Sequence, residues 1–280
     1  MAGLRGALVM AGLTLALGVP APAHAEDDLG SSHGVNYLLE SGDDLVPVDL
    51  ACADGSHPTG GGFLQPSIVG EPFWSFPLGD SWRVFMHVPA AGAQTVNAYV
   101  MCKKGNLRHR EKDLEIAAGK TKLAKVGCPG ATHATGGGGA MEASGGDGWI
   151  NSSYPYDDGD RGRKPDDGWK IRIYNQDGDS HPMEVHAICQ KRLPRYVQDS
   201  LMLSPSTSSA SIPECRSSDP VIGAGIRMSG EASSGIPRAL EPIDKGDGND
   251  VPDDGVLANG SNAPGAPKAK KLTGYAICDT

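Results

Sequence analysis

The sequence predicts an all-β protein made of three internal repeats, each with about four short strands. Three observations support this fold class: a Cys-to-Gly-x-Gly segment occurs three times, apolar and polar residues alternate at period 2, and Gly is abundant while aromatic residues are only 5% of the chain. Three such units related by a pseudo-threefold axis would form a β-prism-like domain, and a β-trefoil is the alternative.

The repeated segment has a constant spacing. An opening Cys is followed by seven residues and then by Gly-x-Gly, in the ranges 52–62, 128–138 and 215–225. Each unit closes on a second Cys that follows an apolar pair, so the units are predicted over 38–102, 114–189 and 201–278. Gly-x-Gly inside a strand allows two backbones to approach closely, which predicts a tight strand crossing rather than a phosphate-binding loop.

Further marks lie between the two cysteines of each unit. Trp82 and Trp169 each stand twenty residues before the closing Cys, and clean alternation after both predicts half-buried strands. A Ser-Phe/Tyr-Pro mark occurs at 75–77 and 153–155, with Gly235-Ile236-Pro237 as its degraded third copy, and Val256 replaces the third Trp. Helical periodicity is absent; the nearest helical candidate, 107–118, carries charges on all sides.

The N-terminus has the three-part layout of a secretory signal peptide over residues 1–25: Arg5, an apolar stretch, and Ala-His-Ala before Glu26. We therefore expect a secreted, extracellular protein with a flexible tail over 26–37 and one β domain over 38–280. No later stretch is long and apolar enough to predict a membrane span.

An even number of cysteines in an exported chain predicts three disulfides. They involve Cys52, Cys102, Cys128, Cys189, Cys215 and Cys278. Repeat symmetry leaves two regular patterns, pairing within units or between successive units. We favour pairing within units because it joins the start and the end of each repeat, which would stabilise the fold by roughly 4 kcal/mol per bond in the chain-entropy model.

The opening Cys, the Gly-rich strand and the closing Tyr/His-x-Met/Ile-Cys together resemble a three-repeat unit of uncharacterised secreted bacterial proteins. More distantly, this framework resembles the vitelline membrane outer layer protein family, whose members are three-repeat β-prisms. The resemblance covers residues 38–278 and implies a fold rather than an activity, and it carries over no functional residue. The third unit departs from the pattern because it lacks the Trp, the His and the third Gly.

A formal net charge of −9 and a pI near 5.3 argue against a nucleic-acid partner or an anionic membrane surface. The acidic side chains gather in two loops that follow the Ser-Phe/Tyr-Pro position, and these loops are the candidate calcium ligands: Asp157, Asp158, Asp160, Asp244, Asp247, Asn249 and Asp250. A solvated acidic loop is the favoured alternative, and no cofactor other than calcium is expected. His57 and His133 occupy equivalent positions, with Asp219 at the third, and are predicted to make structural hydrogen bonds near the cysteine turn; a two-His-one-carboxylate metal site is the weaker alternative.

Aromatic residues flank the acidic loop of the second unit. Trp149, Tyr154 and Tyr156 are the candidate ligand-binding residues, and Trp149 and Tyr156, which have no counterparts in the other units, are predicted to lie on the surface. Aromatic rings beside acidic groups can stack on sugars, so the first hypothesis is a non-enzymatic binding or structural protein that recognises an extracellular glycan or cell-surface component through its inter-strand loops. The alternative is a secreted hydrolase that uses the carboxylates of the acidic loops. No catalytic residue is assigned because these loops offer no Glu or His pair with a recognisable spacing.

Overall fold

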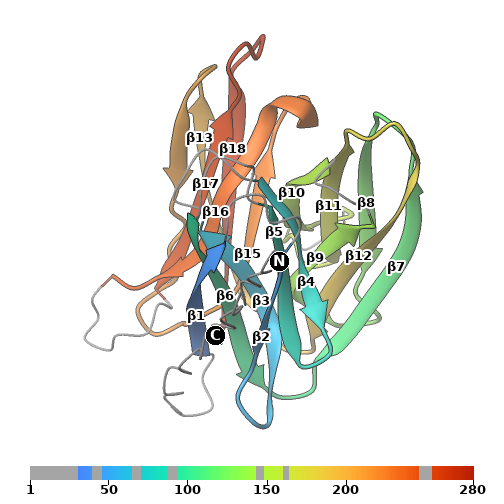
Figure 1. Cartoon of the computed structure of the whole chain (residues 1–280). Coiled ribbons are helices and arrows are strands. Elements are labelled where there is room, and N and C mark those ends of the chain that lie inside the picture. Colours follow the sequence, from blue (N-terminus) through green and yellow to red (C-terminus); the bar gives the residue numbers. More distant parts are fainter. Residues whose placement is uncertain are drawn as a thin grey trace, which may run out of the picture.

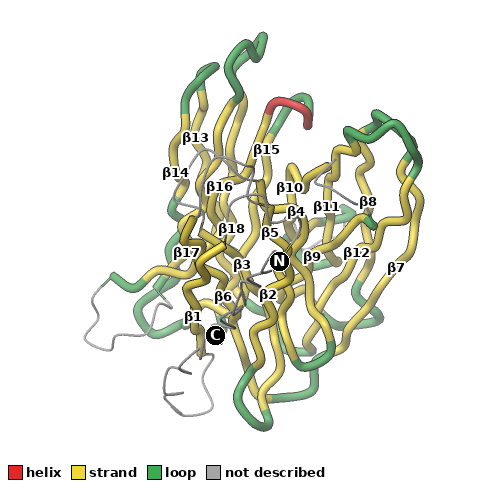
Figure 2. The backbone as a smooth tube through the Cα atoms, viewed as in Figure 1, coloured by secondary structure: helices red, strands yellow, loops and turns green. Residues whose placement is uncertain are grey.

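The computed structural model describes residues 31–39, 46–64, 71–87, 94–142, 148–159, 164–245 and 254–280. Over these residues the chain forms eighteen β-strands, one short 3-10 helix (η1, Ala232–Ser234) and no α-helix (Figures 1 and 2). The all-β prediction is therefore confirmed. The predicted signal peptide, 1–25, lies outside the described residues.

Each unit contributes six consecutive strands rather than about four. The first unit contains β1 (Ser31–Leu39), β2 (Val46–Ala51), β3 (Ser56–Leu64), β4 (Glu71–Leu78), β5 (Ser81–His87) and β6 (Gln94–Lys104). The second contains β7 (Arg108–Ile116), β8 (Thr121–Gly127), β9 (His133–Met141), β10 (Gly148–Tyr156), β11 (Gly168–Asn175) and β12 (His181–Gln190). The third contains β13 (Arg195–Leu203), β14 (Ser208–Ser211), β15 (Val221–Met228), β16 (Gly235–Ile243), β17 (Gly255–Asn262) and β18 (Lys270–Cys278).

The strands form three open, antiparallel sheets of six strands with one common order. Each sheet places the first, sixth and third strands of one unit beside the fourth, fifth and second strands of another. The orders are β1-β6-β3-β16-β17-β14 (sheet I), β2-β5-β4-β9-β12-β7 (sheet II) and β13-β18-β15-β10-β11-β8 (sheet III). In Figure 1, β7 and β12 of sheet II lie at the right, and β13 and β18 of sheet III lie at the upper left. This repeated order confirms the pseudo-threefold, prism-like prediction over the β-trefoil.

The three Gly-x-Gly strands, β3, β9 and β15, meet around the pseudo-threefold axis. A Cβ atom on Gly136 would lie 1.9 Å from the carbonyl oxygen of Thr59, and one on Gly223 would lie 1.8 Å from that of Thr135. A Cβ on Gly60 would lie 3.0 Å from the Cα of Gly223, so each of the three strands closely approaches both of the others. The backbones are too close for any side chain, so the predicted tight strand crossing is present.

All three disulfides form within units, as predicted. They join Cys52 to Cys102, Cys128 to Cys189, and Cys215 to Cys278, over sequence separations of 50, 61 and 63 residues. Each bond ties the segment before the third strand to the sixth strand of the same unit. Because each unit shares its strands between two sheets, these bonds also hold neighbouring sheets together.

The tryptophans and the serines of the Ser-Phe/Tyr-Pro mark are partners. Trp82 and Trp169 are 1% and 0% exposed. Their indole Nε1 atoms donate hydrogen bonds to the hydroxyl oxygens of Ser75 (2.9 Å) and Ser153 (2.8 Å). The Ser of each Ser-Phe/Tyr-Pro segment therefore has a structural role, because its hydroxyl accepts the hydrogen bond of a buried indole N–H group.

The third copy of this mark is not where the sequence predicted it. Strand register places a proline opposite the Trp position in all three units: Pro77 with Trp82, Pro155 with Trp169, and Pro242 with Val256. The third copy is thus Leu240-Glu241-Pro242, not Gly235-Ile236-Pro237. Leu240 and Val256 both lie in the hydrophobic core, so an apolar pair replaces the Ser–Trp hydrogen bond.

Two further segments correct the sequence predictions. Ser31–Leu39 pairs with β6 along its whole length, so the predicted tail is a strand from residue 31 onward. The helical candidate 107–118 is strand β7, which is exposed over most of its length. The first strand of each unit lies at the edge of its sheet, and in β7 only the C-terminal residues Leu114 and Ile116 pack against the core, which leaves little apolar alternation to detect. The units accordingly begin at 31, 108 and 195, earlier than predicted.

Candidate functional site

The three predicted ligand-binding aromatics all lie on β10 of sheet III. Trp149, Tyr154 and Tyr156 are only 6%, 8% and 6% exposed, so the prediction that Trp149 and Tyr156 lie free on the surface is wrong. Side chains of neighbouring strands cover them. The ring of Trp149 packs edge-on against Tyr174 of β11, with 4.9 Å between ring centroids. Tyr154 and Tyr156, in contrast, line a groove.

This groove has a volume of about 690 Å³ and lies on the face of sheet III that points away from the core. Its walls come from β10, β11, β13, β15 and β18, together with the segments next to them. Tyrosine rings and basic side chains dominate the lining: Tyr154, Tyr156, Tyr196, Tyr275, Lys170 and Arg227. Residues from the second and third units thus form one concave surface.

Strand register explains how the groove is built. Lys170 pairs with Tyr154, and Tyr275 pairs with Gly225. The β10–β15 register places Tyr154 beside Gly225, so the four residues form one row across β11, β10, β15 and β18. Because Gly225 has no side chain, the rings of Tyr154 and Tyr275 stack above it with centroids 6.0 Å apart. The Gly-x-Gly segment therefore has two roles: Gly223 allows the close backbone contact at the axis, and Gly225 leaves room for the stacked tyrosine rings of the groove.

Two cations of the groove lie against tyrosine rings. Lys170 Nζ is 4.3 Å from the ring centroid of Tyr156, and Arg227 Cζ is 5.2 Å from that of Tyr154. Burial lowers the pKa of Lys170, since the charged ammonium loses hydration there. No carboxylate in the described ranges forms an ion pair with Lys170 or Arg227. The groove therefore offers positive charge to a ligand.

The acidic loops are only partly described. Asp160, Asp247, Asn249 and Asp250 lie outside the described residues. Asp158 forms an ion pair with Lys125 (2.6 Å), and Asp157 accepts a hydrogen bond from the backbone N–H of Gly159 (2.5 Å). Asp244 is exposed at the end of β16, on sheet I rather than sheet III. The described carboxylates of the two loops thus form no shared cluster, and calcium binding stays a prediction.

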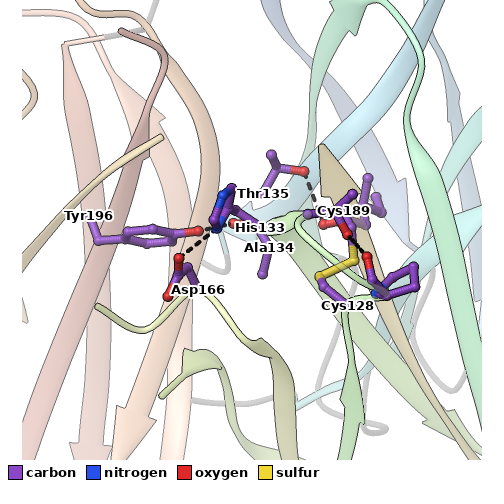
Figure 3. The surroundings of a disulfide bond; sticks show 10 residues. Cys128, His133, Ala134, Thr135, Asp166, Cys189 and Tyr196 are labelled. Atoms are coloured by element: carbon purple, nitrogen blue, oxygen red, sulfur yellow. Dashed lines mark hydrogen bonds and ion pairs between the residues drawn. A yellow bond between two sulfur atoms is a disulfide. The ribbon is translucent and has the colours of Figure 1, made fainter. Parts of the chain in front are cut away.

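The equivalent residues His57, His133 and Asp219 each have a different partner. His133 Nδ1 lies 2.6 Å from a carboxylate oxygen of Asp166, next to the Cys128–Cys189 disulfide (Figure 3). His57 Nδ1 lies 2.8 Å from Asp80, and Asp219 pairs with Arg195 at 2.9 Å. These contacts agree with the predicted structural role and do not bring the three side chains to one ion.

The same neighbourhood is anchored by hydroxyl groups. In Figure 3, Tyr196 approaches the strand that carries His133, and its hydroxyl donates to the carbonyl oxygen of Ala134 (2.5 Å). The hydroxyl of Thr135 donates to the carbonyl oxygen of Ile188 (3.1 Å). Tyr196 therefore ties the rim of the groove to the disulfide-linked end of the second unit.

Sheets I and II carry the counterparts of the Tyr154–Gly225–Tyr275 row. On sheet II the row is Phe76–Gly138–His186, and its two rings stack at 5.3 Å. On sheet I it is Glu241–Gly62–Tyr99, where burial raises the pKa of Tyr99 to about 12. The fold thus presents three equivalent outer surfaces with three different chemistries. The sheet III surface unites tyrosines with the cations Lys170 and Arg227.

Sequence reasoning found Tyr154 and Tyr156 but missed Lys170, Arg227 and Tyr275. The alternation after Trp169 did place Lys170 on the face opposite the core. That signal was insufficient, since nothing in local spacing shows that β10 lies beside β15 of the next unit.

The chain matches none of the models of known protein families that were searched, and no curated protein is significantly similar to it. None of the helices among the described residues has the length and apolar character needed to cross a membrane.

Proposed function

We propose that this chain is an exported, disulfide-stabilised, non-enzymatic protein that binds acidic glycans in the groove of sheet III. The supporting observation is the pair of cations, Lys170 and Arg227, which form no ion pair with a carboxylate among the described residues, although Asp157 also lines the groove and, with Asp158, acts electrostatically on Lys170. Both cations lie in a groove of a chain whose net charge is −9. Positive side chains in a concave site of an otherwise negatively charged protein favour an anionic ligand.

The shape and the chemistry of the groove support a sugar ligand. A volume of about 690 Å³ lies within the usual range for ligand sites, about 300–1,000 Å³. Tyr154, Tyr156 and Tyr275 are only 5–8% exposed, so a sugar would meet the edges of these rings rather than their faces, and the cations would supply most of the contact. Lys170 and Arg227 would donate charge-assisted hydrogen bonds to the carboxylate or sulfate group of an acidic sugar.

Export is supported by the N-terminal layout and by the disulfides. Three disulfides within one chain persist in an oxidising compartment and are rare in the cytosol. We expect the protein recovered from culture medium to begin at Glu26, which N-terminal sequencing would establish. Recovery of the uncut chain inside the cell would contradict export.

The ligand class can be tested with a glycan array followed by calorimetry. We expect binding to uronate-containing or sulfated oligosaccharides, little binding to their neutral analogues, and weaker binding at higher salt. Lys170→Glu and Arg227→Glu should each remove this binding. Lys120→Glu changes charge at an exposed turn outside the groove lining and should leave binding intact.

Equal binding of neutral and acidic glycans would refute the proposal, as would full binding by both groove variants. Turnover on a panel of hydrolase substrates that is lost in Asp158→Asn would instead support a secreted hydrolase. Asp158 is held by Lys125, which leaves it a poor candidate for an acid or base.

A further inference from the structure

The outer face of sheet II carries a cluster of histidines and carboxylates at its edge. Strand alternation places His109, Glu111 and Asp113 on one face of β7. Register then pairs Glu111 with His186 and Asp113 with Glu184 on the adjacent strand β12. Five side chains able to bind a metal ion therefore lie side by side on two neighbouring strands.

The spacing of the cluster suits a single ion. His109 Nε2 and His186 Nδ1 lie 2.9 Å apart. Two imidazole nitrogens bound to one Zn²⁺ at about 2.0–2.1 Å are separated by about 3 Å in tetrahedral or five-coordinate geometry. The ligand atoms of His109, Glu111 and His186 all lie within 4.8 Å of one another, and the same holds for Glu111, Asp113 and Glu184.

His186 is a buried ligand candidate whose two ring nitrogens have different neighbours. Its side chain is 3% exposed and stacks between the rings of Phe76 (5.3 Å) and His109 (5.1 Å), which fixes its orientation. Its Nε2 makes no hydrogen bond within the described structure, although a carboxylate oxygen of Glu184 lies 3.2 Å away. A carboxylate beside the second ring nitrogen is the usual outer-shell partner of a metal-ligating histidine, so Nδ1, which faces His109 and Glu111, is the nitrogen available to an ion.

The fold itself does not require this histidine. The equivalent positions of the first and third units are Tyr99 and Tyr275, which occupy the same place beside the Gly-x-Gly strand. The basic residues of β7, Arg108, Arg110 and Lys112, alternate onto the opposite face of the strand, away from the cluster. The carboxylates of Glu111, Asp113 and Glu184 are thus brought together without a cation from β7.

We propose that this cluster binds one divalent transition-metal ion of the Zn²⁺ class, ligated by His109 Nε2, His186 Nδ1 and the carboxylate of Glu111, with Glu184 as the outer-shell partner of His186 Nε2. Mixed imidazole and carboxylate ligands suit Zn²⁺, whereas Ca²⁺ and Mg²⁺ take oxygen ligands. The site lies on sheet II and is independent of the groove on sheet III, so glycan binding does not bear on it.

The test is calorimetric titration of ZnCl₂ into the chelator-treated full chain, with Co²⁺ as a second probe because its visible absorption reports nitrogen ligation and coordination number. One ion per chain is expected. His109→Ala should weaken binding by more than about tenfold, since losing even an outer-shell partner of a metal ligand costs 10–100-fold. His186→Tyr copies the other two units and keeps an aromatic ring for Phe76 to stack on, so it should fold normally and lose binding. His57→Ala removes a histidine on another sheet and should bind like the wild type.

Circular dichroism of each variant would establish that the fold is retained. The proposal is overturned if the wild type takes up no Zn²⁺, or if folded His109→Ala and His186→Tyr proteins bind Zn²⁺ as tightly as the wild type. It is equally overturned if Co²⁺ binds with the absorption of a six-coordinate ion bound only through oxygen.

Discussion

Replacing Ser153 by Ala removes the acceptor of a hydrogen bond from a fully buried indole. Trp169 is 0% exposed, and its Nε1 lies 2.8 Å from the Ser153 hydroxyl oxygen. A buried donor left without its partner costs about 1–3 kcal/mol. We therefore expect Ser153→Ala to lower the free energy of unfolding by that amount.

Ser153→Ala should lower the free energy of unfolding only slightly in a protein that already lacks the indole N–H group of Trp169. In a Trp169→Phe background the Ser153 hydroxyl has already lost its donor, so Ser153→Ala removes a group without a partner. The difference between the two backgrounds gives a coupling energy of about 1–2 kcal/mol.

Four proteins, the wild type, both single variants and the double variant, would be unfolded in urea and followed by far-UV circular dichroism. This signal comes mainly from the backbone, and the midpoint of the transition rather than its amplitude is compared between variants. The equivalent pair in the first unit, Ser75 and Trp82 at 2.9 Å, provides an independent repeat of the cycle.

The reasoning fails if Ser153→Ala costs the same in both backgrounds, within about 0.5 kcal/mol. In that case the joint replacement of Ser and Trp by Leu240 and Val256 in the third unit would need another explanation than hydrogen-bond satisfaction.

Two further changes probe the close crossings and the sheet I surface. Gly138→Ala places a Cβ 1.7 Å from the carbonyl oxygen of Ser75, so we expect a loss of about 1–3 kcal/mol or more in urea unfolding. Unchanged stability would contradict the close approach of β9 to β4. Burial raises the pKa of Glu241, so the folded protein binds the carboxyl proton more tightly than the unfolded chain does. The contribution of this protonated carboxyl group to folding stability is fully present below the unfolded-state pKa. It is lost as the pH rises through the folded-state pKa. Glu241→Gln should therefore melt at a higher temperature than the wild type near neutral pH and lose this part of the pH dependence, as measured by thermal unfolding from about pH 4 to 8. Equal melting temperatures would show that the half-buried carboxylate of Glu241 does not reduce stability.

Short-range spacing carried most of the fold prediction. The Cys-to-Gly-x-Gly segment recurs because every unit needs the same axial crossing, and the closing Cys recurs because every unit forms its own disulfide. Edge strand β7 escaped prediction because it is exposed over most of its length and only Leu114 and Ile116 at its end pack against the core. The mark at Leu240-Glu241-Pro242 escaped because its defining Ser had been replaced together with its partner Trp.

The candidate sites were harder to predict, for a different reason. Tyr154 and Lys170 are close in sequence, but their neighbours Arg227 and Tyr275 come from the next unit. His109 and His186 are 77 residues apart and meet only because the first and last strands of the second unit pair at the edge of sheet II. The alternating His-x-Glu-x-Asp of β7 and Glu-x-His of β12 were visible signals, but only as strands do they place these side chains on one face.

The amino-acid order by itself predicted the β architecture and the threefold repetition, because both depend on residues within one unit. It favoured sulfur pairing within units but left pairing between successive units open. Tertiary structure decided which strands of different units became neighbours. That choice depends on how three glycine-lined backbones pack at the axis, and it determines which side chains share an outer face. The groove and the histidine cluster are consequences of that packing, since each is assembled from strands that are distant in the chain.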